Sequence, residues 1–186
     1  MKKKQVDHVL RAAGRIVKGD QIIIITGSQS LHGKYPDLPD ELVMSMEVDL
    51  YAKDRKLHSE LLNAIGQDSD FHRTFGYYAD PVDDRTDVLP KGWKGRLVNL
   101  PDGDTERVRG LCLDPHDLAI SKYVARREKD IIFTRELARR GYVEQARLLA
   151  LLAKTPVDAA VNARIRENIA EDFRPPAKRR SKAPHS

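Results

Sequence analysis

Two carboxylates placed two residues apart are the first side chains in this sequence that could do chemistry. Glu47 and Asp49 belong to the segment LVMSMEVDL, in which apolar and polar residues alternate. Successive side chains of a strand point to opposite faces, so a strand here would direct both carboxylates to one side. Two adjacent acids repel each other unless water or a cation lies between them, and such oxygen ligands suit Mg²⁺ or Mn²⁺. The pattern predicts either a metal-binding pair or two solvated acids on a half-exposed strand.

The dipeptide Gly27-Ser28 follows the apolar run QIIII and could bind an anion. A glycine after a central strand allows a sharp turn and a close approach of the backbone to a ligand. The Ser28 hydroxyl and the backbone N–H groups after it could hold a phosphate, especially if Ser28 opens a short helix. Gly-Ser pairs also occur in plain turns, so both interpretations stay open.

The elements that would position these residues can be read from the apolar periodicity. Residues 21–26 are rich in β-branched residues and predict a fully buried strand. In residues 42–50, Leu42, Met44, Met46, Val48 and Leu50 are expected on the core face. Helices are expected at 4–18 and 56–65. Further strands are expected at 75–78, 95–100 and 105–113, with a turn at 101–104.

The second half of the chain reads as helical. Asp114 is the expected N-cap and Pro115 the first residue of one or two helices that run to residue 140 and stop at Gly141. Further helices are expected at 143–153 and at 156–171, the latter capped by Thr155. The predicted fold class is α+β, with a small mixed sheet, flanking helices and a C-terminal helical segment. The predicted boundaries are 1–142 for the main domain, 143–173 for a helical extension and 174–186 for a disordered basic tail.

Composition restricts the class of protein. The 186 residues carry a formal net charge of +5, but MKKK holds three positive charges and the tail PPAKRRSKAPHS four, so the remainder is close to −2. The folded body is therefore not a strongly basic nucleic-acid binder, although the tail could attract RNA weakly. A single cysteine, Cys112, and the lack of a signal peptide or a long apolar run favour a cytoplasmic protein.

The order of these features resembles the nucleotidyltransferase superfamily. A strand ends in Gly27-Ser28, a spacer of 18 residues follows, and Glu47-x-Asp49 lies on a second strand. The segment LDPHDLAISKYVARREKD, residues 113–130, resembles the helical element of bacterial nucleotidyltransferase-like proteins of unknown function. It is also similar to that element in abortive-infection toxin nucleotidyltransferases, with matching positions at Lys122, Arg126, Lys129 and Asp130.

The resemblance implies a fold, an activity and a set of residue roles. The sheet would be of the nucleotidyltransferase type, with Gly27 and Ser28 holding a nucleoside triphosphate and Glu47 and Asp49 binding Mg²⁺ or Mn²⁺. Lys122, Arg126 and Lys129 are spaced by four and three residues, so one helical face could carry all three to the triphosphate. The implied acceptor is a hydroxyl of an RNA, such as a tRNA, or of a protein. The resemblance implies a toxin role and a cognate antitoxin partner in the same way. It implies no association with a membrane.

Two features depart from the superfamily pattern and keep an alternative open. The first acid is Glu47 instead of aspartate, and a third carboxylate is not evident. Asp80, Asp83, Asp84 and Asp87 precede the strand expected to carry it, and Asp84 or Asp87, with preference for Asp87, could fill the role. Without a third acid, the chain would be a catalytically degenerate relative that binds a nucleotide or a partner. An RNA-binding module resting on the basic ends is a third possibility.

Overall fold

The computed structural model of the chain describes residues 1–17, 21–51, 55–83, 86–101 and 108–175. A five-stranded mixed sheet lies at its centre, with the order β3-β2-β1-β5-β4. The strands are β1 (Gln21–Ile25), β2 (Glu47–Tyr51), β3 (Tyr78–Val82), β4 (Val98–Asn99) and β5 (Val108–Cys112). β1 runs antiparallel to β2 and parallel to β5, and the carboxyl end of β1 pairs with the carboxyl end of β2, where Ile25 lies opposite Leu50.

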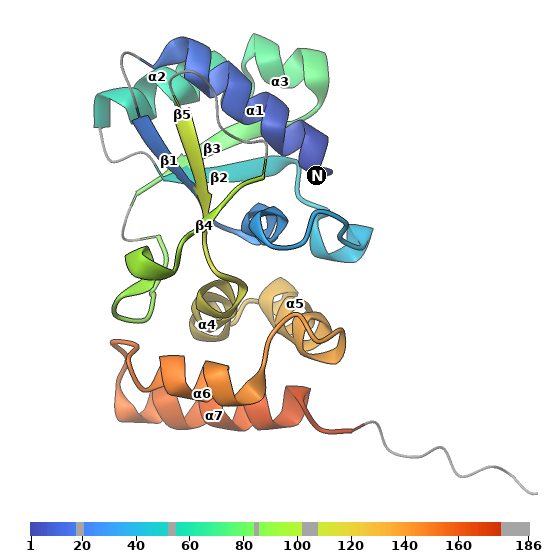
Figure 1. Cartoon of the computed structure of the whole chain (residues 1–186), viewed down its shortest axis with the longest axis vertical. Coiled ribbons are helices and arrows are strands. Elements are labelled where there is room, and N and C mark those ends of the chain that lie inside the picture. Colours follow the sequence, from blue (N-terminus) through green and yellow to red (C-terminus); the bar gives the residue numbers. More distant parts are fainter. Residues whose placement is uncertain (18–20, 52–54, 84–85, 102–107, 176–186) are drawn as a thin grey trace, which may run out of the picture.

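One face of the sheet packs against helices from the first half of the chain. These are α1 (Lys3–Ile16), α2 (Arg55–Ile65) and α3 (Asp70–Phe75), which lie together above the strands in Figure 1. The side chains that fill this layer are alternate residues of the strands and the apolar stripe of α1. They include Ile23, Ile25, Val48, Leu50, Val6 and Leu10, all fully buried. Burial of these apolar residues is the main force holding this layer to the sheet.

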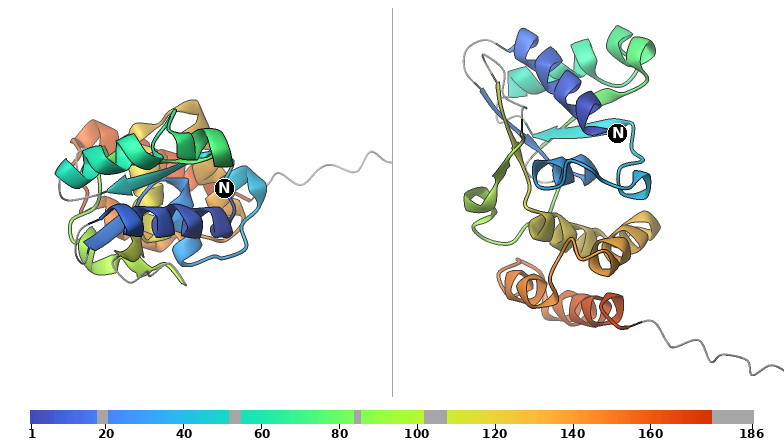
Figure 2. Two further views of the ribbon diagram at one scale, coloured as in Figure 1. Left: turned by 90° about the horizontal axis from the view of Figure 1, so that it is seen from above. Right: turned by 45° about the vertical axis from the view of Figure 1, so that its right-hand side comes forward.

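Four helices from the second half of the chain form a second layer below the sheet. They are α4 (Pro115–Ala125), α5 (Glu128–Arg139), α6 (Gln145–Leu152) and α7 (Ala159–Asp172). In the right-hand view of Figure 2, α4 and α5 lie between the sheet and the α6–α7 pair. Leu118, Leu137, Leu148 and Ile165 belong to one buried cluster, which joins all four helices. Three short 3₁₀ helices, η1 (Ser28–Gly33), η2 (Asp40–Leu42) and η3 (Trp93–Arg96), occur in the described connections.

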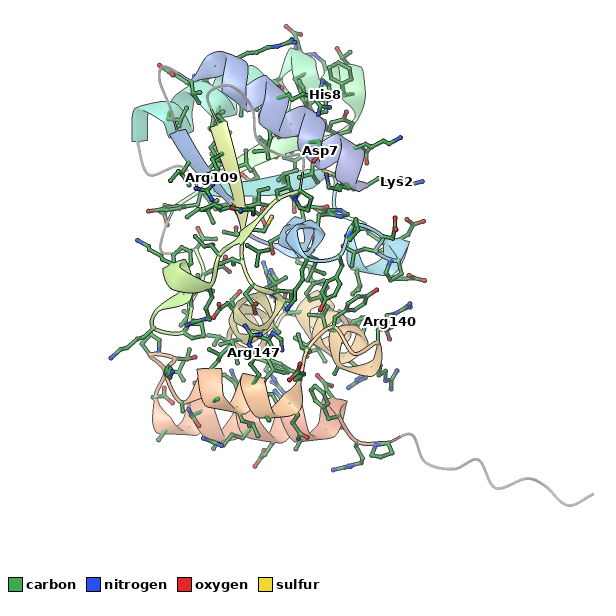
Figure 3. The ribbon with its side chains drawn as sticks, viewed as in Figure 1. Lys2, Asp7, His8, Arg109, Arg140 and Arg147 are labelled. Atoms are coloured by element: carbon green, nitrogen blue, oxygen red, sulfur yellow. The ribbon has the colours of Figure 1, made fainter. Side chains whose placement is uncertain are left out.

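Helix α4 is held in place by buried charges at its amino end. Asp114 accepts a hydrogen bond from the backbone N–H of His116 at 2.9 Å and from the Arg147 guanidinium at 2.9 Å. Arg147 lies where α6 faces α4, as Figure 3 shows. One turn further, the fully buried carboxylate of Asp117 pairs with Arg96 at 2.7 and 2.8 Å. These contacts fix α4 under the carboxyl ends of β1 and β5.

The α+β class and the cap at Asp114 with Pro115 behind it are as predicted, but several boundaries differ. The strand expected over 42–50 begins only at Glu47, and Met44 and Met46 are 78% and 57% exposed, not part of the core. The strand expected at 75–78 is wrong, because α3 ends at Phe75 and the strand follows at 78–82. Ile22 is 55% exposed, so β1 is not fully buried.

The C-terminal elements need smaller corrections. The last helix is capped by Asp158, whose carboxylate accepts from the backbone N–H of Val161 at 2.8 Å, and not by Thr155. The strand predicted at 95–100 is reduced to Val98–Asn99, since Trp93–Arg96 forms η3. The turn predicted at 101–104 and the tail predicted at 174–186 fall largely outside the described residues.

Candidate functional site

The Gly27 turn and the carboxylate of Asp49 lie directly against each other. Gly27 has φ +59°, and a Cβ added to it would lie 1.9 Å from Oδ2 of Asp49. The backbone N–H of Thr26 donates to the Asp49 carbonyl at 2.9 Å, which extends the pairing of β1 with β2 to this point. Only glycine leaves room here and tolerates this backbone conformation. The strand therefore ends on glycine because the carboxylate occupies the space of a side chain.

A further acid lies beside Asp49 on the neighbouring strand. In the parallel pairing of β2 with β3, Asp49 is opposite Asp80 and Glu47 is opposite Tyr78. Residues opposite each other in a parallel pair share a face, so Asp80 points to the same side as Asp49. Sequence reasoning placed Asp80 among four acids but preferred Asp87, because it assigned no strand to residues 78–82. Had a strand been predicted at residues 78–82, Asp80 would have been a candidate for the third carboxylate.

Glu47 is held by a hydrogen bond across the same strand pair. The Tyr78 hydroxyl donates to Oε2 of Glu47 at 3.0 Å, and the Tyr78 ring contacts the His72 ring with 4.6 Å between centroids. Burial together with this bond to Glu47 raises the pKa of Tyr78 to about 12, so the phenol stays protonated and can donate. Tyr78 thereby fixes one oxygen of Glu47 and leaves the other oxygen for a ligand.

Asp87 approaches the same volume from the segment after β3. Its Oδ1 accepts a hydrogen bond at 2.8 Å from the hydroxyl of Ser121, a buried residue of α4. The charge of Asp87 acts on Asp49, as do the charges of Glu47 and Asp80. The structure thus brings four acids to one end of the sheet. Asp84, the other candidate for the third carboxylate, lies outside the described residues.

The pKa of the Asp49 carboxyl group is raised above its ordinary value. Burial is the largest cause, and it raises the pKa of Asp49 to about 6 together with the negative charges of Glu47, Asp80 and Asp87. The ammonium group of Lys122 acts in the opposite direction and lowers it. A buried carboxylate among other acids is a position at which an added cation would be bound favourably.

Ser28 lies at the start of η1, immediately after the turn. Its side chain is half-buried, while the hydroxyl of Ser30 is buried and donates to the Gly27 carbonyl at 2.8 Å. The turn is therefore braced by Ser30. Ser28 is the residue directly after Gly27, whose backbone lies against the Asp49 carboxylate.

The three cations predicted to line one helical face do not do so. Helix α4 ends at Ala125, and Arg126 is its C-cap with a left-handed φ of +53°. Lys122 points inward, with its Nζ 3.9 Å from Oδ1 of Asp130, whereas Lys129 lies exposed on α5. The spacing of four and three residues assumed one continuous helix, and the left-handed residue breaks it.

Arg127 is a cation near the site that sequence reasoning missed. It is the N-cap of α5, and its backbone N–H and Nε both donate to Oδ2 of Asp130, at 3.1 and 2.7 Å. The bonds to Asp130 are the main cause that raises the pKa of Arg127, and the charges of Asp87 and Asp49 add to it. Asp130 thus holds both Arg127 and Lys122.

The oxygen donors at this end of the sheet fit a hard divalent cation. Asp49 has a carboxylate destabilised by like charge, Glu47 has an oxygen beyond its bond to Tyr78, and Asp80 and Asp87 lie around them. Within the described ranges, no three acidic, histidine or cysteine side chains converge tightly enough to hold a metal unaided. Mg²⁺ commonly uses one or two carboxylates and takes its other ligands from water and substrate phosphates, so the arrangement fits that ion.

Comparison with known families gives the class of protein to which the chain belongs. Residues 4–174 match the family described as "Nucleotidyltransferase of unknown function (DUF6036)", and the chain belongs to that family. No curated protein and no solved structure matches the chain. None of the helices in the described ranges is long and apolar enough to cross a membrane. The match includes α6 and α7, so the family spans both layers of the molecule.

Proposed function

We propose that the protein is a metal-dependent nucleotidyltransferase that moves a nucleoside monophosphate from a nucleoside triphosphate to a hydroxyl group. The observation that carries the proposal is the seating of the Asp49 carboxylate on Gly27, with Glu47, Asp80 and Asp87 around it. A phosphate-holding turn and metal-binding acids in one place are what such a reaction needs. The family description supports the reaction class.

Each group of residues has a role in this proposal. Glu47 and Asp49 hold Mg²⁺ or Mn²⁺, and Asp80 or Asp87 supplies the third carboxylate. Ser28 and the backbone after Gly27 hold phosphate oxygens. The bound metal would polarise the α-phosphate and stabilise the charge of the leaving group. Lys122 and Arg127 offset the negative charge of the triphosphate from the α4–α5 side.

The reaction forms one bond and breaks another. The acceptor hydroxyl oxygen bonds to the α-phosphorus, and the bond from that phosphorus to the oxygen bridging to the β-phosphate breaks. Pyrophosphate leaves, and the hydroxyl proton passes to a carboxylate of the cluster. We propose an RNA end, such as that of a tRNA, or a protein side chain as the acceptor. If transfer blocks the amino-acid-accepting end of a tRNA, expression would arrest growth, and a cognate antitoxin would relieve the arrest.

Transfer of label tests the proposal. Each α-labelled nucleoside triphosphate is incubated with the protein, Mg²⁺ or Mn²⁺, total RNA and cell protein. The Asp49→Asn variant runs beside it, with Asp70→Asn as a control because the Asp70 side chain is 96% exposed on α3. We expect wild type and Asp70→Asn to transfer label to one acceptor class. We expect no transfer by Asp49→Asn, and none by wild type when a chelator is present. Label that persists in Asp49→Asn would refute the assigned role of that residue.

One observation favours a second candidate, a degenerate relative that binds a nucleotide or a partner without transfer. Lys122 already provides a positive charge near Asp49, and Tyr78 already occupies one oxygen of Glu47. In a degenerate site, the Lys122 ammonium and the Tyr78 hydroxyl would permanently take the place of the metal beside the two carboxylates. Triphosphate binding that is equally strong with and without divalent cation, and no transfer of label, would favour this candidate.

A further inference from the structure

A pocket of about 170 Å³ opens between the helices beside the carboxylate site. It lies where α4 ends, α5 begins and α7 runs past them. Its lining includes Lys122, Tyr123, Arg126, Ile131, Asn168 and Glu171. None of the roles assigned above uses its α7 side. The volume is below the roughly 300–1,000 Å³ of pockets that hold whole small-molecule ligands, so it suits a single ring system.

The pocket and the carboxylate site share a wall. Lys122 lines the pocket, its Nζ lies 3.9 Å from Oδ1 of Asp130, and its charge acts on Asp49. Ser121, the preceding residue of α4, donates to Asp87 at 2.8 Å. One turn of α4 therefore faces the acids and the pocket together. A ligand with an anionic part at the acids could extend past Lys122 into the pocket.

The far wall of the pocket is held rigidly. The buried Asp172 of α7 accepts from the Tyr123 hydroxyl at 2.9 Å and from the Thr134 hydroxyl at 3.1 Å. Arg135 adds a third contact to Asp172, from Nε to Oδ1 at 3.4 Å. These bonds tie α7 to both α4 and α5. The pocket therefore has a fixed shape, which favours selective binding.

The groups that remain available in the pocket match the edge and the faces of a nucleobase. The half-buried Asn168 offers an amide with both donors and an acceptor, and the exposed Glu171 carboxylate accepts hydrogen bonds. Ile131 is 37% exposed and offers an apolar surface for a ring face. Arg126 offers a guanidinium, which stacks on planar rings. Carboxylates accept from exocyclic amino groups of bases, as side-chain amides also do.

We propose that this pocket holds the base of the nucleoside triphosphate and selects a base that carries an exocyclic amino group. The proposal rests on the proposed function, since the triphosphate would lie at Gly27 and Asp49. Asn168 and Glu171 contact the base edge, and Ile131 and Arg126 contact its faces. Uracil presents no amino group and offers its edge only one N–H donor, at N3, between two carbonyl acceptors, so UTP is the least favoured nucleotide.

Magnetic resonance of the full chain labelled with ¹⁵N tests the pocket without requiring transfer. ATP, CTP, GTP and UTP are titrated in the presence of Mg²⁺, and two sets of backbone amides are followed. One set is Gly27 and Ser28, and the other is Ile131, Asn168 and Glu171. The variants are Asn168→Ala, Asp49→Asn and Asn162→Ala. Asn162 is a matched control on α7, since it contacts Arg166 on the surface and does not line the pocket.

We expect the resonances of both sets of amides to shift when a nucleotide with an exocyclic amino group is added. We expect UTP to bind about tenfold more weakly than that nucleotide. Asn168→Ala should weaken binding of that nucleotide about tenfold and abolish the shifts of the pocket set, while Asn162→Ala leaves the affinity and the shifts unchanged. Shifts at Gly27 and Ser28 alone, with Asn168→Ala binding as wild type, would overturn the pocket and leave the transferase proposal standing. Shifts of the pocket set alone, unchanged in Asp49→Asn, would support the pocket and count against the transferase. No shift in either set would refute both.

Discussion

At the scale of single residues, the site depends on a contact between one glycine and one carboxylate. Gly27 has a positive φ, and its missing side chain is replaced by Oδ2 of Asp49. The sequence allowed the prediction that Gly27-Ser28 and Glu47-x-Asp49 belong together, because each pattern has a local physical meaning. It led to Asp84 or Asp87, with preference for Asp87, and could not place Asp80 opposite Asp49, since that placement depends on the register of β3 against β2.

Gly27→Ala should damage the site more than an alanine at another glycine with positive φ. A side chain is strained at any positive φ, and the φ of +59° and ψ of −168° at Gly27 belong to a region that essentially only glycine occupies. At Gly27 the new Cβ must also displace Asp49, whereas at Gly141, with φ +73°, a Cβ meets nothing within 4 Å. We expect Gly27→Ala to lose triphosphate binding and Gly141→Ala to keep it. Equal binding in both variants, measured by calorimetry, would contradict the role of this contact.

Asp49→Asn should stabilise the metal-free protein at alkaline pH. The folded-state pKa of about 6 is above the ordinary value of 3.8, so the folded state binds the proton more tightly than the unfolded state. The cost of ionising Asp49 is absent well below pH 4, grows as the pH rises through 4 to 6, and is complete above that range. We expect the variant to gain about 1–3 kcal/mol in free energy of unfolding at pH 8 and less at pH 5.

Urea denaturation in chelator at the two pH values measures this difference. Asp70→Asn is the control, because an exposed carboxylate should show little dependence on pH. A variant less stable than wild type at pH 8 would mean that Asp49 is stabilised by the fold in its charged form.

At the scale of elements, the break between α4 and α5 decides which cations can act on a ligand. The left-handed Arg126 ends α4, so Lys122 and Lys129 lie on different helices. Periodicity could not predict this, because positions 122, 126 and 129 fit a continuous helix and Arg126 is not a residue that marks helix ends. The αL residue redirects the chain and makes Arg127 the N-cap of α5, where Asp130 holds it.

Lys122 and Lys129 should therefore differ in their effect on triphosphate binding. We expect Lys122→Met to weaken the affinity about tenfold, equivalent to about 1.4 kcal/mol, because it removes a positive charge that acts on Asp49. Lys129→Met should change it by no more than about twofold, because its side chain is exposed on α5 and screened by solvent. Calorimetric titration of the two variants compares them. A similar loss of affinity in both variants would support the single basic helical face that was predicted from the sequence.

Helix α7 should be anchored mainly by Asp172. Asp172→Ala removes the acceptor of the buried Tyr123 hydroxyl and the partner of Arg135, while the Thr134 hydroxyl can still donate to the Ile131 carbonyl at 3.2 Å, so the change should cost about 2 kcal/mol. Asp158→Ala on the same helix removes only an N-cap and should cost about 1 kcal/mol. Urea denaturation at neutral pH gives both values. A cost for Asp172→Ala no larger than that for Asp158→Ala would show that this network does not hold α7.

At the scale of the whole molecule, the acids lie at the boundary between the two layers. Alternate residues of β1 and β2 bury Ile23, Ile25, Val48 and Leu50 against α1 and α2. The opposite face of the sheet carries Asp49 and Glu47 toward α4. The α+β class and the helical second half followed from periodicity and capping residues. The strand order did not follow, because it pairs β1 with β5, which lies far along the chain from β1.

Calorimetric titration of a nucleoside triphosphate, with and without Mg²⁺, into wild type and Asp49→Asn tests the central claim most directly. The claim is that Gly27 and Asp49 form a metal-dependent triphosphate site. It predicts that wild type binds with Mg²⁺, and that binding falls at least tenfold without the metal or with Asp49→Asn. Asp70→Asn should bind as wild type. No binding to wild type by any of the four triphosphates, or equal binding by Asp49→Asn, would contradict the claim.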